Sequence, residues 1–261
     1  MQDYELEKFA GYIDSAERIV VFTGAGISTE SGIADFRSPG GIWTKIKPIQ
    51  FSDFVNSEQV RLEDWRRRFH FQTEFDAAPL NHGHVAVADI VSSDKGMGLI
   101  TQNIDGLHQR SGIPQHLIVE IHGNGTRARC LDCESPMTLV EARQIIEETE
   151  AAPRCNRCGG LVKSAVISFG QPMRQAEMVQ AEQLAAGCDL FLVLGSSLVV
   201  QPAATLPLIA RNNGAELVII NNQPTPLDAI ASQVIHEPLG KSLKKALEKT
   251  HLDAGSANNS R

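Results

Sequence analysis

The sequence is short of three things: cysteine, a surplus of basic residues, and any long apolar run. A net charge of −7 over 261 residues argues against nonspecific nucleic-acid binding as a main role. No run approaches the roughly 20 apolar residues of a membrane span. The acidic start, Met1–Glu5, is unlike a targeting signal. We therefore expect a cytoplasmic protein that acts on neither nucleic acid nor a membrane. Its length predicts one large domain, or one domain with a small insert, and its 42% apolar content is ordinary for a globular protein with a core.

The few cysteines stand mostly in pairs. Cys130 with Cys133 and Cys155 with Cys158 form two Cys-x-x-Cys hooks, with 21 residues between them. Two such hooks can hold one tetrahedral zinc ion, although this gap is one residue longer than is usual in zinc ribbons. In the cytoplasm, paired cysteines favour metal over disulfides. Four thiolates leave no open position, so we expect a structural zinc; the alternative is two turns without metal. Cys188 is predicted to be a core residue.

Short apolar runs alternate with helical patterns along most of the chain. The runs are 18–23, 97–101, 117–121, 190–194 and 217–220, and the helical patterns are 3–16, 82–92, 175–186 and 201–212. This alternation predicts a parallel sheet with both faces covered. Two stretches interrupt it: 39–79, a predicted helical insert, and 126–163, which holds the cysteine hooks and a predicted helix at 138–149. Residues 253–261 are typical of a disordered tail.

Polar or glycine-rich residues follow each predicted strand. In open parallel sheets the ligand lies outside the carboxyl ends of the strands, so these clusters predict one shared crevice. The clusters are Gly24–Ser28, Gln102–Asp105, His122–Asn124, Gly195–Ser197 and Asn221–Asn222.

Two of these clusters indicate phosphate binding. Gly24-Ala25-Gly26 lets the backbone come close to a pyrophosphate, whose charge nearby N–H groups stabilise. The same pattern is often only a tight turn, but Gly195-Ser196-Ser197 strengthens the phosphate interpretation. No acidic residue directly follows the next strand, so Asn221 is the candidate to bind a ribose. Asp35-Phe36-Arg37 is either an ordinary loop with an ion pair, or an aromatic lid and a charge beside a cofactor.

Other polar residues at the strand ends are candidates for chemistry. His122 directly follows a strand, and a neutral imidazole near pH 7 is a natural general base, although a histidine in this place is more often structural. Asn103 and Asp105 offer groups for a carboxamide and are also common turn formers. The basic run Arg66–Arg68 favours a solvated helix face over an anion site.

Taken together, the motifs resemble those of sirtuins, which are NAD-dependent protein-lysine deacylases. From about residue 5 to 250 they stand in the family's order: Gly24–Arg37, Thr101–His108, His122–Gly123, the two cysteine hooks, Phe169–Gly170, Gly195–Ser197 and Ile220–Asn221. The resemblance implies a Rossmann-type domain made of 1–38, 80–125 and 164–250. It also implies a smaller domain made of the helical insert 39–79 and the zinc ribbon 126–163, with 251–261 as a tail. NAD and an acyl-lysine peptide would meet between the two domains.

The resemblance further implies site residues. His122 would be the general base, with Asn103 as the second catalytic residue. The implied NAD site comprises Gly24, Ala25, Gly26, Asp35, Phe36, Arg37, Gln102, Asn103, Ile104, Asp105, Gly195, Ser196, Ser197, Asn221, Asn222 and Glu237. The peptide would lie along Val166, Ile167, Ser168, Phe169 and Gly170, and zinc would be held by Cys130, Cys133, Cys155 and Cys158.

The implied chemistry begins with loss of nicotinamide, which leaves an oxocarbenium-like ribose carbon. The acyl-lysine oxygen, held in place, attacks this carbon to give an imidate. His122 then assists the ribose hydroxyls, while Phe36 keeps water away from NAD. The products would be free lysine, nicotinamide and O-acyl-ADP-ribose.

The chain departs from the family pattern at several positions. Ala34 replaces a proline and should make the cofactor loop more flexible. Ser168 and Gln171 replace an aromatic and a glutamate in the peptide strand, whose backbone can still pair with a peptide. The Tyr-x-x-Arg pair of desuccinylating sirtuins is absent, because Trp65 stands where tyrosine should precede Arg68. We therefore expect acetyl or longer neutral acyl groups.

Other functions remain open at this point. A mono-ADP-ribosyltransferase on the same scaffold is the main alternative, and an NAD-sensing module without catalysis is the next. A dehydrogenase is disfavoured, because no hydride-transfer pair is evident. The sequence does not indicate an oligomeric state.

Overall fold

The computed structural model describes residues 3–252, and the predicted tail at 253–261 lies outside them. Its larger sheet is parallel and has the strand order β3-β2-β1-β7-β8-β9. The strands are β1 (Ile19–Thr23), β2 (Gly96–Thr101), β3 (Ile118–Glu120), β7 (Leu190–Leu194), β8 (Glu216–Ile220) and β9 (Gln233–Ile235). The predicted parallel sheet is confirmed, with β9 as an additional edge strand.

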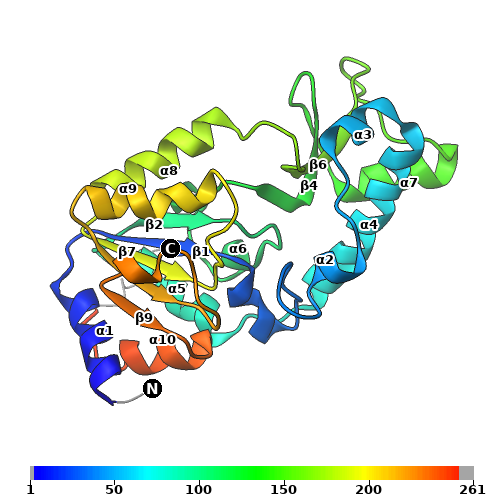
Figure 1. Cartoon of the computed structure of the whole chain (residues 1–261). Helices are drawn as coiled ribbons and strands as arrows, with labels where there is room; N and C mark the ends of the chain where they lie inside the picture. The colour runs from blue at the N-terminus through cyan, green and yellow to red at the C-terminus, as the bar shows by residue number, and fades with distance from the viewer. Residues whose placement is uncertain (1–2, 253–261) are drawn as a thin grey trace, which may run out of the picture.

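Helices cover both faces of this sheet (Figure 1). One layer contains α1 (Asp3–Ser15), α5 (His82–Ser92) and α10 (Leu239–Leu247), and the other contains α8 (Gln175–Gly187) and α9 (Leu206–Asn212). Successive strand residues point to opposite faces. Accordingly Val21 belongs to the core beneath the first layer, and Val20 and Phe22 belong to the core beneath the second. Both faces are apolar, as a doubly covered parallel sheet requires.

The helix predicted at 201–212 is shorter than expected. A 3-10 turn, η3 (Ala203–Thr205), comes first, and α9 begins only at Leu206. Pro207 lies in the first turn of α9, where its missing N–H costs no helical hydrogen bond. A continuous helix from 201 would place this proline in its interior, where it breaks the hydrogen-bond ladder.

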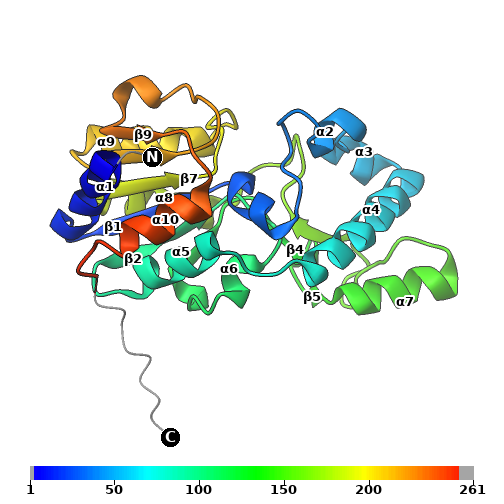
Figure 2. The ribbon, with the colours of Figure 1, turned by 90° about the horizontal axis from the view of Figure 1, so that it is seen from below.

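A second, smaller lobe joins the helical insert to the cysteine hooks (Figure 2). It contains α2 (Ile42–Lys45), α3 (Phe51–Asn56), α4 (Glu58–Ala77), α7 (Leu139–Thr149) and an antiparallel sheet of β5 (Pro136–Met137), β4 (Gly123–Cys130) and β6 (Val162–Val166). Trp65 of α4 is fully buried against Leu139 and Ala142 of α7 and against Val162 of β6. The insert and the ribbon therefore share one apolar core.

Strands β4 and β6 connect the two lobes. The domain boundaries predicted after residues 125 and 163 fall inside these strands. The remaining short elements are η1 (Ala25–Ser31), α6 (Leu107–Arg110), η2 (Gln115–Leu117) and η4 (Asp228–Ile230). Among the helices within residues 3–252, none is both long and apolar enough to cross a membrane.

Candidate active site

The glycine loops after β1 and β7 contact each other directly. The Gly24 amide donates to the Leu194 carbonyl at 3.0 Å, and the Gly26 amide donates to the Gly195 carbonyl at 2.8 Å. A Cβ on Gly24 or on Gly26 would lie only 2.7 Å from the Gly195 oxygen. Both glycines are thus required for this close approach, which lies where the strand order reverses. Ligands of open parallel sheets bind at such reversals.

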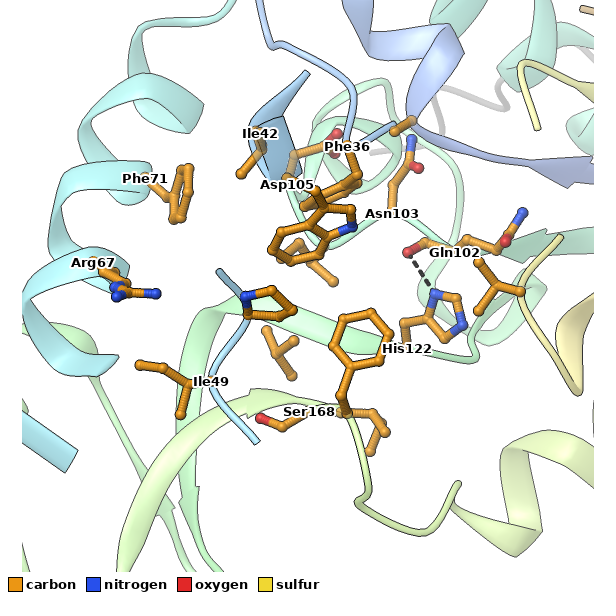
Figure 3. A pocket seen from close by; sticks show the side chains of 18 of the residues that line it. Phe36, Ile42, Ile49, Arg67, Phe71, Gln102, Asn103, Asp105, His122 and Ser168 are labelled. Carbon is orange, nitrogen blue, oxygen red and sulfur yellow. Dashed lines mark hydrogen bonds between the residues drawn. The ribbon is translucent and has the colours of Figure 1, made fainter. Parts of the chain in front are cut away.

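A cavity of about 360 Å³ opens between the lobes at the carboxyl ends of β1, β2 and β3. Both lobes contribute to its lining: Arg67 and Phe71 come from α4, whereas Asn103 and His122 follow strands of the large sheet (Figure 3). The predicted site residues brought together here are Ala25, Phe36, Arg37, Gln102, Asn103, Ile104, Asp105, His122, Val166, Ile167, Ser168, Phe169 and Gly170.

Other predicted residues lie outside this lining. They are Gly24, Gly26, Asp35, Gly195, Ser196, Ser197, Asn221, Asn222 and Glu237, and most of them follow β1, β7, β8 or β9. Asp35 shapes the cofactor loop, since its Oδ1 accepts from the amides of Arg37 at 3.1 Å and Ser38 at 2.9 Å. Their assignment to an NAD site stays a prediction.

His122 is held by one ring nitrogen and leaves the other free for chemistry. Its Nδ1 lies 3.1 Å from the backbone oxygen of Gln102 (Figure 3). A carbonyl oxygen only accepts, so Nδ1 carries the proton and Nε2 holds the lone pair. Burial lowers the pKa of His122, opposed by the hydrogen bond to Gln102 and assisted by the charge of Arg37. His122 is therefore a neutral base at pH 7.

A buried polar group stands beside this base. The Ser28 hydroxyl donates to Asp105 Oδ2 at 2.7 Å, and Asn103 Nδ2 donates to Ser28 Oγ at 3.3 Å. Asn103 and Asp105 are each only 6% exposed. Burial raises the pKa of Asp105, while the Leu107 amide and Ser28 lower it through hydrogen bonds. These amide and carboxyl groups are suited to bind a carboxamide.

Gln102 links this group to the glycine loop after β7. Its Nε2 donates to Ser196 Oγ at 2.7 Å, and its backbone amide donates to the Thr23 oxygen at 3.0 Å. The ends of β1, β2 and β7 are thus joined by hydrogen bonds at one place. This arrangement fits an extended ligand that lies across all three strand ends.

Trp43 is a lining residue that the motifs did not predict. Its ring centroid lies 5.0 Å from that of Phe36 and 5.6 Å from that of Phe169. The Trp43 amide also donates to the Phe36 oxygen at 3.0 Å. These three rings join the cofactor loop to the peptide strand. Ser28 was missed as well, although its hydroxyl in the Gly24–Ser28 cluster was a signal.

Two residues of α4 that differ by three positions face different environments. Trp65 is buried in the small-lobe core, whereas Arg68 lines the cavity. Asp64 lines the same part of the cavity, and its charge raises the pKa of Arg68 while burial, the larger effect, lowers it. A negative and a positive side chain therefore both line this end of the cavity, and the charge of Asp64 acts on Arg68.

The four paired cysteines converge at the far end of β4 and β6. All four sulfur atoms lie within 4.8 Å of one another. The Cys130–Cys158 and Cys133–Cys158 sulfurs are 3.4 Å apart, and those of Cys133 and Cys155 are 3.6 Å apart. A tetrahedral zinc with bonds of about 2.3 Å separates its sulfurs by roughly 3.8 Å. The donor set and its spacing fit a structural zinc ion.

A comparison with family models matches residues 24–202 to the Sir2 family. The chain belongs to the Sir2 family. This match begins at the glycine loop and includes the cavity and the cysteine hooks, but it ends before Asn221, Asn222 and Glu237.

Similar proteins carry consistent names. The chain is 49% identical to an NAD-dependent protein deacetylase 1 of Bradyrhizobium diazoefficiens, over 91% of this chain and 93% of that protein. A solved Sir2 structure with a deacetylated p53 peptide and 3'-O-acetyl ADP ribose has a TM-score of 0.85 at 33% identity, covering 95% of this chain and all of that one. A second solved structure, of Sir2Tm bound to a propionylated peptide, has a TM-score of 0.81 at 32% identity, covering 94% of this chain and 98% of that one.

Proposed function

We propose that this Sir2-family protein is an NAD-dependent protein-lysine deacylase. It transfers an acyl group from lysine to ADP-ribose and releases nicotinamide, O-acyl-ADP-ribose and free lysine. One observation carries the proposal: a neutral His122, the buried Asn103–Ser28–Asp105 group and the segment 166–170 all line one cavity. The names and bound products of its relatives support the same reaction.

NAD, when bound, supplies nicotinamide as a leaving group and ribose as the acyl acceptor. Asn103 and Asp105 bind the carboxamide and orient the ring. Nε2 of His122 takes a proton from a ribose hydroxyl, and Nδ1 remains held by the Gln102 oxygen. Phe36, in contact with the ring of Trp43, excludes water from the reacting carbon.

The acyl-lysine peptide would lie in extended form along residues 167–170, the segment that follows β6. Gly123 adopts a left-handed φ of 75°, and a Cβ there would lie 1.9 Å from the Ala165 oxygen. This tight turn lets the Ile167 amide donate to the His122 oxygen at 2.9 Å. The peptide strand and the base are thus fixed to each other, and a partner peptide adds by backbone pairing.

Label transfer separates this proposal from mono-ADP-ribosyl transfer. Purified protein is incubated with adenine-labelled NAD, with and without an acetyl-lysine peptide. Deacylation predicts that the label moves from NAD to O-acetyl-ADP-ribose, and that this product forms only when the acetylated peptide is present. Label that stays attached to protein at comparable rates would contradict the proposal and favour the transferase.

The acid limb of the pH–rate profile should lie below pH 6.5. Burial lowers the pKa of His122 in the folded protein below the usual 6.5 of an imidazole, so the base stays unprotonated until the pH falls below that value. The measurement is kcat/KM for an acetyl-lysine peptide between about pH 5 and 8, with the unfolding midpoint followed in parallel. If kcat/KM fell to half its maximum already at pH 7 or above, another group would be the base.

Neutral acyl groups should be removed at least about tenfold more efficiently than succinyl groups. A succinyl carboxylate would meet the carboxylate of Asp64, which lines this end of the cavity and whose charge acts on Arg68. The measurement compares kcat/KM for acetyl-, butyryl- and succinyl-lysine peptides. Asp64→Asn should raise the ratio of succinyl to acetyl activity. Efficient desuccinylation with weak deacetylation in the unsubstituted protein would overturn the proposed selectivity.

We place this activity in the cytoplasm. The four converging thiols support that location, since a zinc-thiolate cluster needs reduced cysteines. The test is fractionation of cells that express the tagged full chain. Recovery of the tag in a membrane or secreted fraction would contradict this location.

A further inference from the structure

A group of buried polar side chains lies behind the carboxamide-binding residues. It includes His84 of α5, His108 of α6, Thr23 of β1 and Thr101 of β2, each no more than 2% exposed. None of these four is among the described residues that line the cavity. Burying polar groups is unfavourable unless they are hydrogen-bonded, so their partners indicate what they do.

A continuous line of hydrogen bonds leads from His108 to the cavity. His108 Nε2 lies 2.9 Å from Thr23 Oγ1, and the Thr23 hydroxyl donates to Thr101 Oγ1 at 2.8 Å. Thr101 Oγ1 also accepts from the Asn103 backbone amide at 3.0 Å. Asn103 continues to Ser28 and Asp105, as described above. His108 is thus connected, through two hydroxyls, to the backbone that presents the Asn103 side chain.

Hydrogen bonds on the side of His84 lead back to η1, the segment that contains Ser28. Asn81 caps α5, with its amide donating to His84 Nδ1 at 3.4 Å. The Asn81 side chain also donates to the Ile27 oxygen at 2.7 Å and to Ser31 Oγ at 2.9 Å. Ile27 and Ser31 flank Ser28 in η1. The His84 and His108 rings, 5.2 Å apart and edge to face, complete a circuit around the carboxamide-binding group.

The hydrogen bonds define the tautomer of each histidine. Because Thr23 donates to Thr101, His108 Nε2 must carry the proton that reaches Thr23, and Nδ1 is bare. Because His84 Nδ1 accepts from Asn81, its Nε2 carries a proton. The two ring nitrogens without a partner in the described chain, His84 Nε2 and His108 Nδ1, are therefore a donor and an acceptor.

Both rings are neutral at the pH of an enzyme assay. Burial lowers the pKa of His84 to about 4, with the charge of Arg110 adding to the effect. Burial lowers the pKa of His108 to about 3, with His84 adding to the effect. Neutral rings match the donor and acceptor pattern above.

We propose that His108 is a positioning residue for the nicotinamide end of the active site. It holds Thr23 and Thr101 at the ends of β1 and β2, and through them it sets where Asn103 stands; His84 orients its ring. The proposal rests on the proposed use of NAD. It concerns the nicotinamide end only, because the line of hydrogen bonds ends at Asn103, Ser28 and Asp105.

The experiment compares His108→Leu with His108→Gln. Leucine removes the donor to Thr23, whereas the glutamine amide nitrogen can take the place of Nε2 and still donate. His108→Leu should raise the KM for NAD and the inhibition constant of nicotinamide by about tenfold, which is the change in affinity expected when one buried hydrogen bond is lost. The KM for the acetyl-lysine peptide and the affinity for ADP-ribose, which lacks nicotinamide, should stay within about twofold. His108→Gln should recover most of the nicotinamide affinity.

Three further variants test the route and the specificity. Thr23→Val keeps the shape of the side chain but removes the hydroxyl, so it should reproduce the effect of His108→Leu, and Thr23→Ser should not. Val87→Ala, in the apolar core on the same helix as His84, serves as a control for lost stability. It should lower the unfolding midpoint without changing the inhibition constant of nicotinamide.

The outcomes separate this proposal from the proposed function. Equal losses for NAD and ADP-ribose, or an unchanged nicotinamide constant in His108→Leu, would overturn the positioning role. Absence of turnover in the unsubstituted protein would instead count against the deacylase. In that case calorimetry of nicotinamide binding to protein saturated with ADP-ribose provides the same comparison of variants without catalysis.

Discussion

His122→Ala should reduce acyl transfer by about 10²- to 10⁴-fold, which is the usual contribution of a positioned general base. The side chain ends in the cavity with Nε2 free, and its Nδ1–H donates a hydrogen bond to the Gln102 oxygen. Alanine removes the base but keeps the backbone, so the Ile167 amide can still donate to the carbonyl of residue 122. The fold, the zinc content and the affinity for ADP-ribose should therefore be retained.

His116 provides a matched control for this substitution. It is an exposed histidine in η2, just before β3, and it does not line the cavity. His116→Ala should leave turnover and the unfolding midpoint unchanged. The measurement is acetyl-peptide turnover by mass spectrometry, together with a thermal unfolding curve of each variant. Near-normal turnover of His122→Ala would remove His122 from the role of base.

Cys155→Ser should release zinc and unfold the small lobe. Zinc binding contributes about 10 kcal/mol or more to the folding of small zinc peptides, and the core around Trp65 includes Cys130 and Cys155 themselves. Strands β4 and β6 run from the hooks to His122 and Ile167. Loss of the metal should therefore abolish activity as well, although the parallel sheet, with its own two cores, stays folded.

Cys188→Ala is the control for this experiment, since Cys188 is a buried cysteine of the large domain. It should keep one zinc per chain and retain activity. Zinc content is measured by mass spectrometry of the metal, and hydrogen exchange follows residues 126–163 separately from the parallel sheet. A zinc-free Cys155→Ser protein with an unchanged melting curve and protected residues 126–163 would contradict the structural role.

The parallel sheet could be predicted because its central strands are apolar on both faces. Every residue of β1 and β7 is buried, so each reads as a continuous apolar run between polar clusters. β9 was missed because three residues, Gln233–Ile235, carry no periodicity. α10 was missed although Leu239, Leu243 and Ala246 have helical spacing, because Pro238 and Gly240 at its start are typical of a loop.

The candidate site was predictable where residues directly follow strands. His122, Asn103 and Asp105 needed only the rule that parallel strands end at one edge. The contribution of α4 was not predictable in this way. Trp65 and Arg68 are three positions apart and lie near one helical face. Only the packing of the lobes sends one into the small core and the other into the cavity.

The buried hydrogen-bond circuit around His108 could not be predicted from the sequence either. Its members come from three separate stretches of chain, 23–31, 81–84 and 101–108, and their hydrogen bonds depend on positions that tertiary packing sets. The motif Thr101–His108 indicated that these residues belong to the site. It did not indicate that Thr23 is their hydrogen-bond partner, because Thr23 lies 78 residues before Thr101.

The most direct test of the central claim is mass spectrometry of the zinc-loaded protein with an acetyl-lysine peptide, with and without NAD. The deacylase predicts NAD-dependent loss of acetyl from the peptide and equal amounts of nicotinamide and O-acetyl-ADP-ribose. Deacetylation without NAD, or consumption of NAD with no O-acetyl-ADP-ribose formed, would contradict it.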